Sequence, residues 1–293
     1  MTRDGWPAPA KLNLFLHVTG LRSDGYHELQ TLFQLVDLTD EIEISVSRDG
    51  AITRSAGLAG LPPDADLVVR AARRLRDEAG DPGLGADLRV LKRIPAGAGL
   101  GGGSSDAATT LVALNLLWGL DLPAARLAAL GLELGADVPL FIRGTSALAR
   151  GIGEDLQPVA IPPAWFAIVF PGHPVATRDA FQAPELTRNS PLITISGFLS
   201  PEWPVRPLAG RNDLEPVVAA RHAPVRAALE WLGTRGEARM SGSGGAVYAA
   251  FATEAAAAAA LAGLPAPWVG FVVAGIARSP LAARVAAARR RSP

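Results

Sequence analysis

The sequence predicts an α+β protein of two domains, and three observations support this prediction. The chain opens with alternating apolar and polar residues, which indicate antiparallel strands. A glycine-rich loop at 97–103 leads into a long helical segment. A proline cluster at 158–163 precedes a second set of strands and helices that alternate without a run of parallel crossovers. We therefore expect domains at 1–158 and 159–293.

Alternation predicts the strands of the first domain. Apolar residues at even positions from 10 to 18 fall on one side of a strand, and Lys11 and Asn13 fall on the other. The pair Asp24-Gly25 predicts a turn after this strand. The strands expected in this domain are 10–18, 26–36, 42–46 and 88–94.

Helical spacing of apolar residues predicts the helices of both domains. These helices are expected at 67–79, 104–120, 123–133, 214–232 and 254–262. Asp213 and Pro216 form a suitable helix start. Strands expected in the second domain are 165–170, 246–251 and 269–275, and Arg289 to Arg291 are expected to form a solvated terminus.

The composition excludes several classes of protein. Among 293 residues there are 28 Lys and Arg, 28 Asp and Glu, and no Cys. The balanced charge argues against bulk binding to nucleic acid or an anionic membrane, and the absence of Cys excludes disulfides and cysteine-bound metals. No stretch of about 18 apolar residues or apolar signal core is present. We expect a cytoplasmic protein, monomeric or homodimeric, whose partner is a small molecule.

The glycine-rich loop is the strongest candidate site. Five Gly in seven positions increase the conformational entropy that the chain loses on folding. This cost is tolerated where the backbone must approach a ligand closely. The first N–H groups of the following helix lack internal partners, and the helix dipole is positive there, so this arrangement suits phosphate. The residues expected to hold phosphate are Pro95, Ala96, Gly97, Ala98, Gly99, Leu100, Gly101, Gly102, Gly103, Ser104 and Ser105.

Two nucleotide-binding motifs compete for this loop. A P-loop is excluded because no Lys follows the glycines. Gly97, Gly99 and Gly102 satisfy the GxGxxG dinucleotide fingerprint, with Asp121 about 20 residues further on. A dehydrogenase therefore remains an alternative, although the charged strand before the loop and the antiparallel start of the chain argue against it.

Three segments of the sequence together resemble the motifs of a known family. The pattern PxxxGLGGGSSDAA from Pro95 resembles the phosphate-binding motif of the GHMP kinases. Residues 9–14, PAKLNL, resemble the first motif of that family, and residues 241–245, SGSGG, resemble the third. Residues 134–141, LGADVPLF, and 212–215, NDLE, extend the resemblance over nearly the whole chain.

The resemblance implies a fold, a reaction and its cofactors. It implies an N-terminal domain like domain 2 of ribosomal protein S5, a ferredoxin-like C-terminal domain, and a site in the cleft between them. It further implies a kinase that uses ATP and Mg²⁺ to phosphorylate a hydroxyl of a cytidine-diphosphate-linked branched tetritol, on the non-mevalonate route to isoprenoid precursors. No Asp or Glu pair indicates the Mg²⁺ ligands. A kinase of another small alcohol and a non-enzymatic nucleotide-binding protein remain alternatives.

Asp137 and Lys11 are the candidate catalytic residues. Asp137 lies in an apolar run, where an isolated carboxylate is rare unless it is partnered or catalytic. From the residues alone, a helix cap or a structural ion pair is an equal alternative. The resemblance implies that Asp137 accepts the alcohol proton, that Lys11 orients it, and that Asn13 donates to the tetritol or to Asp137.

The expected cytidine site combines a hairpin tip with a later segment. A pyrimidine has a flat face and a hydrogen-bonding edge, which suit an aromatic ring beside an imidazole. The resemblance implies that cytosine stacks on Tyr26 and pairs with His27, and that Thr177 and Phe181 lie beside the cytidine. Without it, the residues favour an ordinary hairpin tip, with Tyr26 as an exposed aromatic and His27 as a surface histidine.

Overall fold

A single mixed sheet organises the computed structural model, which describes residues 5–57, 60–194, 204 and 210–291. Within these residues the sheet has ten strands in the order β3-β4-β2-β10-β7-β9-β8, while β1 and β5 also pair with β2, and β6 pairs with β5. The strands are β1 (Trp6–Leu21), β2 (His27–Ser47), β3 (Ile52–Ala56), β4 (Gly85–Leu91), β5 (Ala147–Arg150), β6 (Asp155–Pro158), β7 (Trp165–Phe170), β8 (Arg239–Met240), β9 (Val247–Phe251) and β10 (Val269–Ile276).

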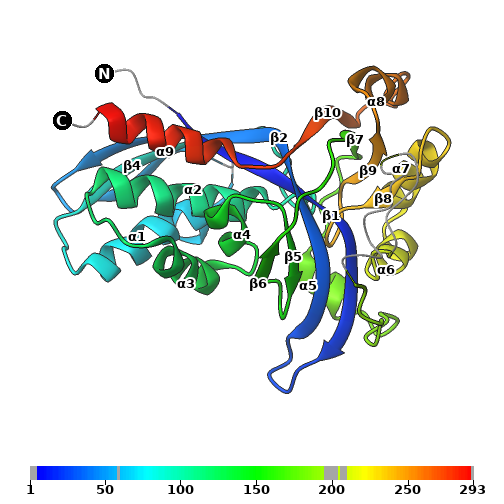
Figure 1. Cartoon of the computed structure of the whole chain (residues 1–293), viewed down its shortest axis with the longest axis horizontal. Helices are drawn as coiled ribbons and strands as arrows, with labels where there is room; N and C mark the ends of the chain where they lie inside the picture. Colours follow the sequence, from blue (N-terminus) through cyan, green and yellow to red (C-terminus); the bar gives the residue numbers. More distant parts are fainter. Residues whose placement is uncertain (1–4, 58–59, 195–203, 205–209, 292–293) are drawn as a thin grey trace.

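The helices gather in two groups at the ends of this sheet. In Figure 1, α1 to α4 lie together beside β4, whereas α6 to α8 lie beside β8 and β9. The helices are η1 (Pro63–Ala65), α1 (Leu67–Ala79), α2 (Gly102–Leu117), α3 (Ala124–Leu134), α4 (Val138–Arg143), α5 (Thr177–Phe181), α6 (Glu215–Arg221), α7 (Ala223–Gly233), α8 (Glu254–Ala260) and α9 (Pro280–Arg291). The α+β class is thus confirmed.

The first two strands form a long antiparallel hairpin that carries Lys11 and Asn13. Lys11 pairs with Leu35 and Asn13 with Phe33. The prediction of separate strands at 26–36 and 42–46 was wrong, because β2 continues between them. The register shifts there between Pro9 and Ala10, so the extra residues of β2 form a bulge instead of a turn.

Three helix predictions also need correction. The predicted helix 214–232 is two helices, α6 and α7, which meet at His222 because Pro224 lacks an N–H and restricts the residue before it. The helix predicted from 104 begins at Gly102. Helix α9 was not predicted: Arg289 and Arg290 at its end are exposed, as expected, whereas Leu281 at its start is buried and Arg284 lies over the Trp6 ring.

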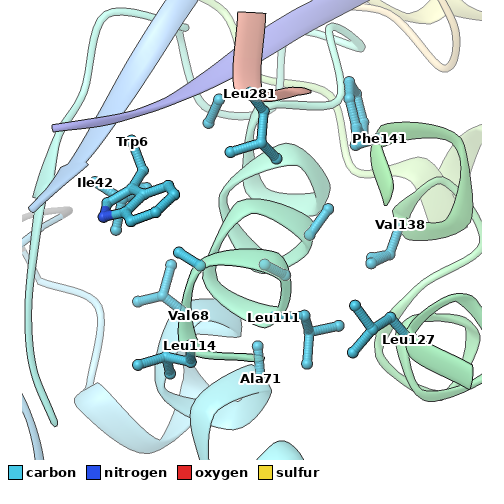
Figure 2. Close-up of a cluster of buried hydrophobic side chains, with 14 of the residues drawn as sticks. Trp6, Ile42, Val68, Ala71, Leu111, Leu114, Leu127, Val138, Phe141 and Leu281 are labelled. Atoms are coloured by element: carbon cyan, nitrogen blue, oxygen red, sulfur yellow. The ribbon is translucent and has the colours of Figure 1, made fainter. Parts of the chain in front are cut away.

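The main core packs the first group of helices against the sheet. Figure 2 shows Leu111 of α2 between Val68 of α1 and Leu127 of α3, with Leu114 of α2 below Val68 and Leu281 of α9 above them. Strand β10 pairs with β7 and also with β2, so the last elements of the chain return to its first half. The division after residue 158 stays a prediction. Within the described part of the chain, no helix is both long enough and apolar enough to cross a bilayer.

Candidate active site

A cavity of about 550 Å³ opens where β1, the glycine-rich loop, the start of α2 and the loop after β8 meet. Ten of the eleven residues predicted to hold phosphate line it, from Pro95 through Ser104. Ser105, the eleventh, has its side chain fully buried in α2. The cavity therefore has the glycine loop as one wall and a helix start at its end.

Close backbone packing explains the glycines of this loop. Gly97, Gly99 and Gly101 have φ of 65°, 73° and 73°, the left-handed region that favours Gly. A Cβ on Gly99 would lie only 2.1 Å from the carbonyl oxygen of Ser241. Gly101 directly precedes α2 and offers no side-chain cap, so the first amides of α2 remain free to bind an anion.

The side chains of Lys11 and Asp137 meet at the cavity wall. The Lys11 ammonium is 4% exposed, and its Nζ lies 3.4 Å from Oδ2 of Asp137, which is 30% exposed. Asp137 directly precedes α4 but makes no capping hydrogen bond to it. The helix cap that the sequence analysis gave as an alternative role for Asp137 is therefore not formed. The buried Lys11 ammonium holds the carboxylate instead.

Asn13 orients the Lys11 ammonium. Its Oδ1 accepts a 2.5 Å hydrogen bond from Lys11 Nζ, while its Nδ2 donates to Thr31 Oγ1 at 2.8 Å. Thr31 in turn donates to the carbonyl oxygen of Phe15 at 2.5 Å. This series of hydrogen bonds fixes the Asn13 amide with its oxygen toward Lys11. Thr31, which the sequence did not predict, therefore contributes to the position of the ammonium.

The residues predicted to bind cytidine are only partly brought together. Thr177 and Phe181 line the cavity, and the ring centroid of His27 lies 5.3 Å from that of Phe181. Arg188 Nε donates to His27 Nε2 at 3.1 Å, and burial together with this guanidinium lowers the pKa of His27. The neutral ring thus presents its Nδ1 hydrogen. Tyr26 is 60% exposed at the hairpin tip, apart from the cavity lining.

A buried charge cluster beneath the start of α2 was not predicted. Lys92 Nζ lies 2.5 Å from Asp40 Oδ2 and 2.7 Å from Asp106 Oδ2. Burial raises the pKa of Asp106 to about 7, although the Lys92 ammonium acts to lower it. Asp106 belongs to the GSSDAA segment of the glycine motif, so the sequence could have indicated a role for it. Nothing in the sequence near Asp40 indicates that it pairs with Lys92.

The oxygen donors at the cavity suit a magnesium ion that arrives with a nucleotide. Among the described residues, no three His, Asp or Glu side chains gather into a metal site. Ser104 and Asp137 do line the cavity near the free amides of α2. Mg²⁺ prefers oxygen ligands, retains water, and commonly binds through one or two carboxylates together with phosphates.

Comparison with known proteins gives one consistent result. The model "GHMP kinases N terminal domain" matches residues 66–145, and "GHMP kinases C terminal" matches residues 202–270. The 4-diphosphocytidyl-2-C-methyl-D-erythritol kinase of Thiobacillus denitrificans is 52% identical over 276 residues, which are 94% of this chain and 96% of the relative. That of Halorhodospira halophila is also 52% identical, over 97% of each chain.

Solved structures extend this similarity to the fold. The crystal structure of a 4-(cytidine 5'-diphospho)-2C-methyl-D-erythritol kinase matches with a TM-score of 0.81 and 35% identity, covering 93% of this chain and 100% of the other. The crystal structure of L. major mevalonate kinase in complex with R-mevalonate matches with a TM-score of 0.65 and 16% identity, covering 95% of this chain and 97% of the other. The second match supports the fold alone.

Proposed function

Since this chain belongs to the GHMP kinases, and within them to the 4-diphosphocytidyl-2-C-methyl-D-erythritol kinases, we propose that it phosphorylates the 2-hydroxyl group of that substrate with ATP. The reaction serves the non-mevalonate, or methylerythritol phosphate, route to isoprenoid precursors. The observation that carries the proposal is the Lys11–Asp137 pair beside the glycine loop, in a chain about half identical to these kinases along nearly its whole length. The alternative of a dehydrogenase is wrong.

The proposed mechanism assigns phosphate binding to the main chain. The free amides at the start of α2 and the left-handed glycines before it hold the triphosphate of ATP. The Ser104 hydroxyl, together with the nucleotide's phosphates, would hold a Mg²⁺ ion, which would neutralise phosphate charge when bound. These donors are set in place before the reaction, so they need no rearrangement as charge develops.

Proton transfer falls to Asp137. Its carboxylate accepts the proton of the 2-hydroxyl as the oxygen attacks the γ-phosphorus, while the bond from that phosphorus to the bridging oxygen breaks and ADP leaves. Lys11 keeps this carboxylate directed toward the cavity, and its ammonium offsets negative charge at the transferred group. Asn13 supports both roles by holding Lys11 Nζ.

The cytidine end of the substrate is assigned to the part of the cavity that Thr177 and Phe181 line. We expect Phe181 and Tyr26 to supply aromatic faces, His27 to bind the pyrimidine edge, and Thr177 to contact the linking groups. Mg²⁺ dependence, cytoplasmic location and a monomeric or homodimeric state stay predictions from the sequence.

An ADP-release assay tests the proposal. The diphosphocytidyl substrate is compared with 2-C-methyl-D-erythritol 4-phosphate, which lacks the cytidine, and with a panel of other small alcohols. We expect turnover of the diphosphocytidyl compound and at least about 100-fold lower kcat/KM for the others, since each lost set of contacts is worth several kcal/mol. Preferred turnover of another alcohol would favour a different kinase of the same family. A protein that releases no ADP with any of these compounds would contradict the proposal.

A further inference from the structure

The NDLE segment at 212–215 has no part in the mechanism above, yet its first residue is tightly built into the site. Asn212 is 6% exposed and uses its whole amide. Its Nδ2 donates to the carbonyl oxygens of Gly242 at 2.7 Å and Met240 at 3.0 Å, and its Oδ1 accepts from Leu214 N at 3.0 Å. One side chain therefore fixes the carbonyl of Met240, at the end of β8, and that of Gly242, in the loop that follows.

The opposite end of the same segment completes this attachment. Glu215 Oε2 accepts from the backbone N–H of Met240 at 2.7 Å. Met240 pairs with Val247 on its other side, as part of the β8–β9 ladder. Asn212 and Glu215 thus make the backbone hydrogen bonds to Met240 that a neighbouring strand would otherwise make. Of these two side chains, only Asn212 also binds Gly242.

Gly242 lies directly against the proposed reacting groups. A Cβ on Gly242 would sit 3.1 Å from Asn13 Oδ1 and 3.2 Å from Lys11 Nζ, so the loop closes over both side chains. The neighbouring Ser241 Oγ accepts from Asn13 N at 3.3 Å and donates to the Gly99 carbonyl at 3.0 Å. A shift of this loop would move Lys11 and the glycine loop relative to each other.

The segment is also aligned on the strand that carries Lys11. Leu16 N donates to the Arg211 carbonyl at 3.0 Å, and Asp213 N donates to the Leu16 carbonyl at 2.8 Å. Asn212 is therefore held between β1 and the loop at 240–245. We infer that Asn212 is a positioning residue for phosphoryl transfer, which sets the Gly242 loop against Lys11 and Asn13; the inference rests on the proposed function.

The substitution Asn212→Asp tests this inference. It preserves shape and the Oδ1 acceptor, but sets a carboxylate oxygen against two carbonyls. We expect kcat to fall about 100-fold, the size of effect that a displacement near 1 Å produces, while KM for ATP stays within about threefold. Because a protonated carboxyl donates one hydrogen bond, part of the lost kcat should return at low pH, which adds an ionisation to the kcat–pH profile that the wild type lacks.

A matched control separates positioning from stability. Val225→Ala in α7 removes buried methyl groups away from the loop, and it should lower Tm while leaving kcat unchanged. Wild-type protein that is inactive on the diphosphocytidyl substrate would overturn the proposed function. Active wild type with unchanged kcat in Asn212→Asp, or with an equal kcat loss in the control at matched Tm, would overturn this inference alone. If the aspartate variant does not fold, Asn212→Ser is judged by the same kinetic criteria. If neither folds, Asn212 serves folding and the inference is wrong.

Discussion

Lys11 Nζ and Asp137 Oδ2 lie 3.4 Å apart at the wall of one cavity, although one residue belongs to the first strand and the other precedes α4. The cation is buried, whereas the carboxylate keeps an exposed side. A carboxylate in this arrangement can accept a proton from a bound alcohol while its partner holds it in position. This relationship connects the sequence motifs to the chemistry.

The close approach at Gly99 predicts a loss of ATP binding when a methyl group is added. Gly99→Ala combines a positive φ with a collision against Ser241, so we expect ATP affinity to fall at least about tenfold, or by ~1.4 kcal/mol. Gly119→Ala is the matched control, because Gly119 has a φ of 67° but open space around its Cα. It should lose about 1–2 kcal/mol of stability with normal ATP affinity. Calorimetric titration with ATP decides, and equal affinity in a folded Gly99→Ala protein would disprove the role of this contact.

The raised pKa of Asp106 predicts a pH dependence of stability. Its pKa is about 7 in the folded protein and 3.8 ordinarily, so between these values the folded state holds the proton more strongly. This contribution is complete below about pH 4 and is lost as the pH rises towards about 7. Asp106→Asn has no such proton, so its free energy of unfolding should rise relative to wild type over that interval. Urea unfolding of both proteins measures this, and a difference that does not vary with pH would contradict it.

Local patterns predicted helices and strands well where one face of the element is apolar and buried. Alternation predicted the first hairpin, and α1 has the predicted bounds. The break predicted in β2 lies between residues 36 and 42, where the polar residues Asp37 and Asp40 stand. Asp37 instead accepts the N–H of Ala274, and Asp40 those of Arg93 and Ile94, partners that are far away in the sequence. Such long-range hydrogen bonds have no local signature.

The candidate site likewise combines residues that local motifs predicted with residues whose contacts are long-range. The glycine loop, Lys11 and Asp137 stand in recognisable motifs, and the structure brings them to one cavity. Lys92 and Asn212 act through carbonyls and carboxylates from distant segments, so only the fold makes their partners visible. Tyr26 is the opposite case, since its motif is clear but its side chain lies at an exposed hairpin tip.

The hairpin tip and Phe181 predict separate control of substrate affinity. His27→Ala, Tyr26→Ala and Phe181→Ala should each raise KM for the diphosphocytidyl substrate about tenfold, since stacking on a base is worth ~1–3 kcal/mol, and leave KM for ATP unchanged. Leu21→Ala is the control, because Leu21 is 59% exposed on the same hairpin. Steady-state kinetics with each substrate varied gives the answer. Unchanged KM in all three variants would move the cytidine site elsewhere.

The kcat of Asp137→Asn tests the central claim most directly, measured on purified, folded protein with saturating ATP and diphosphocytidyl substrate. We expect a decrease of about 100- to 10,000-fold, the usual contribution of a general base, with ATP affinity retained. Lys11→Ala should show a loss of similar order. Asp155→Asn, at an exposed position on β6, should keep wild-type kcat. Wild-type kcat in Asp137→Asn would show that this carboxylate does not accept the proton, and would contradict the account.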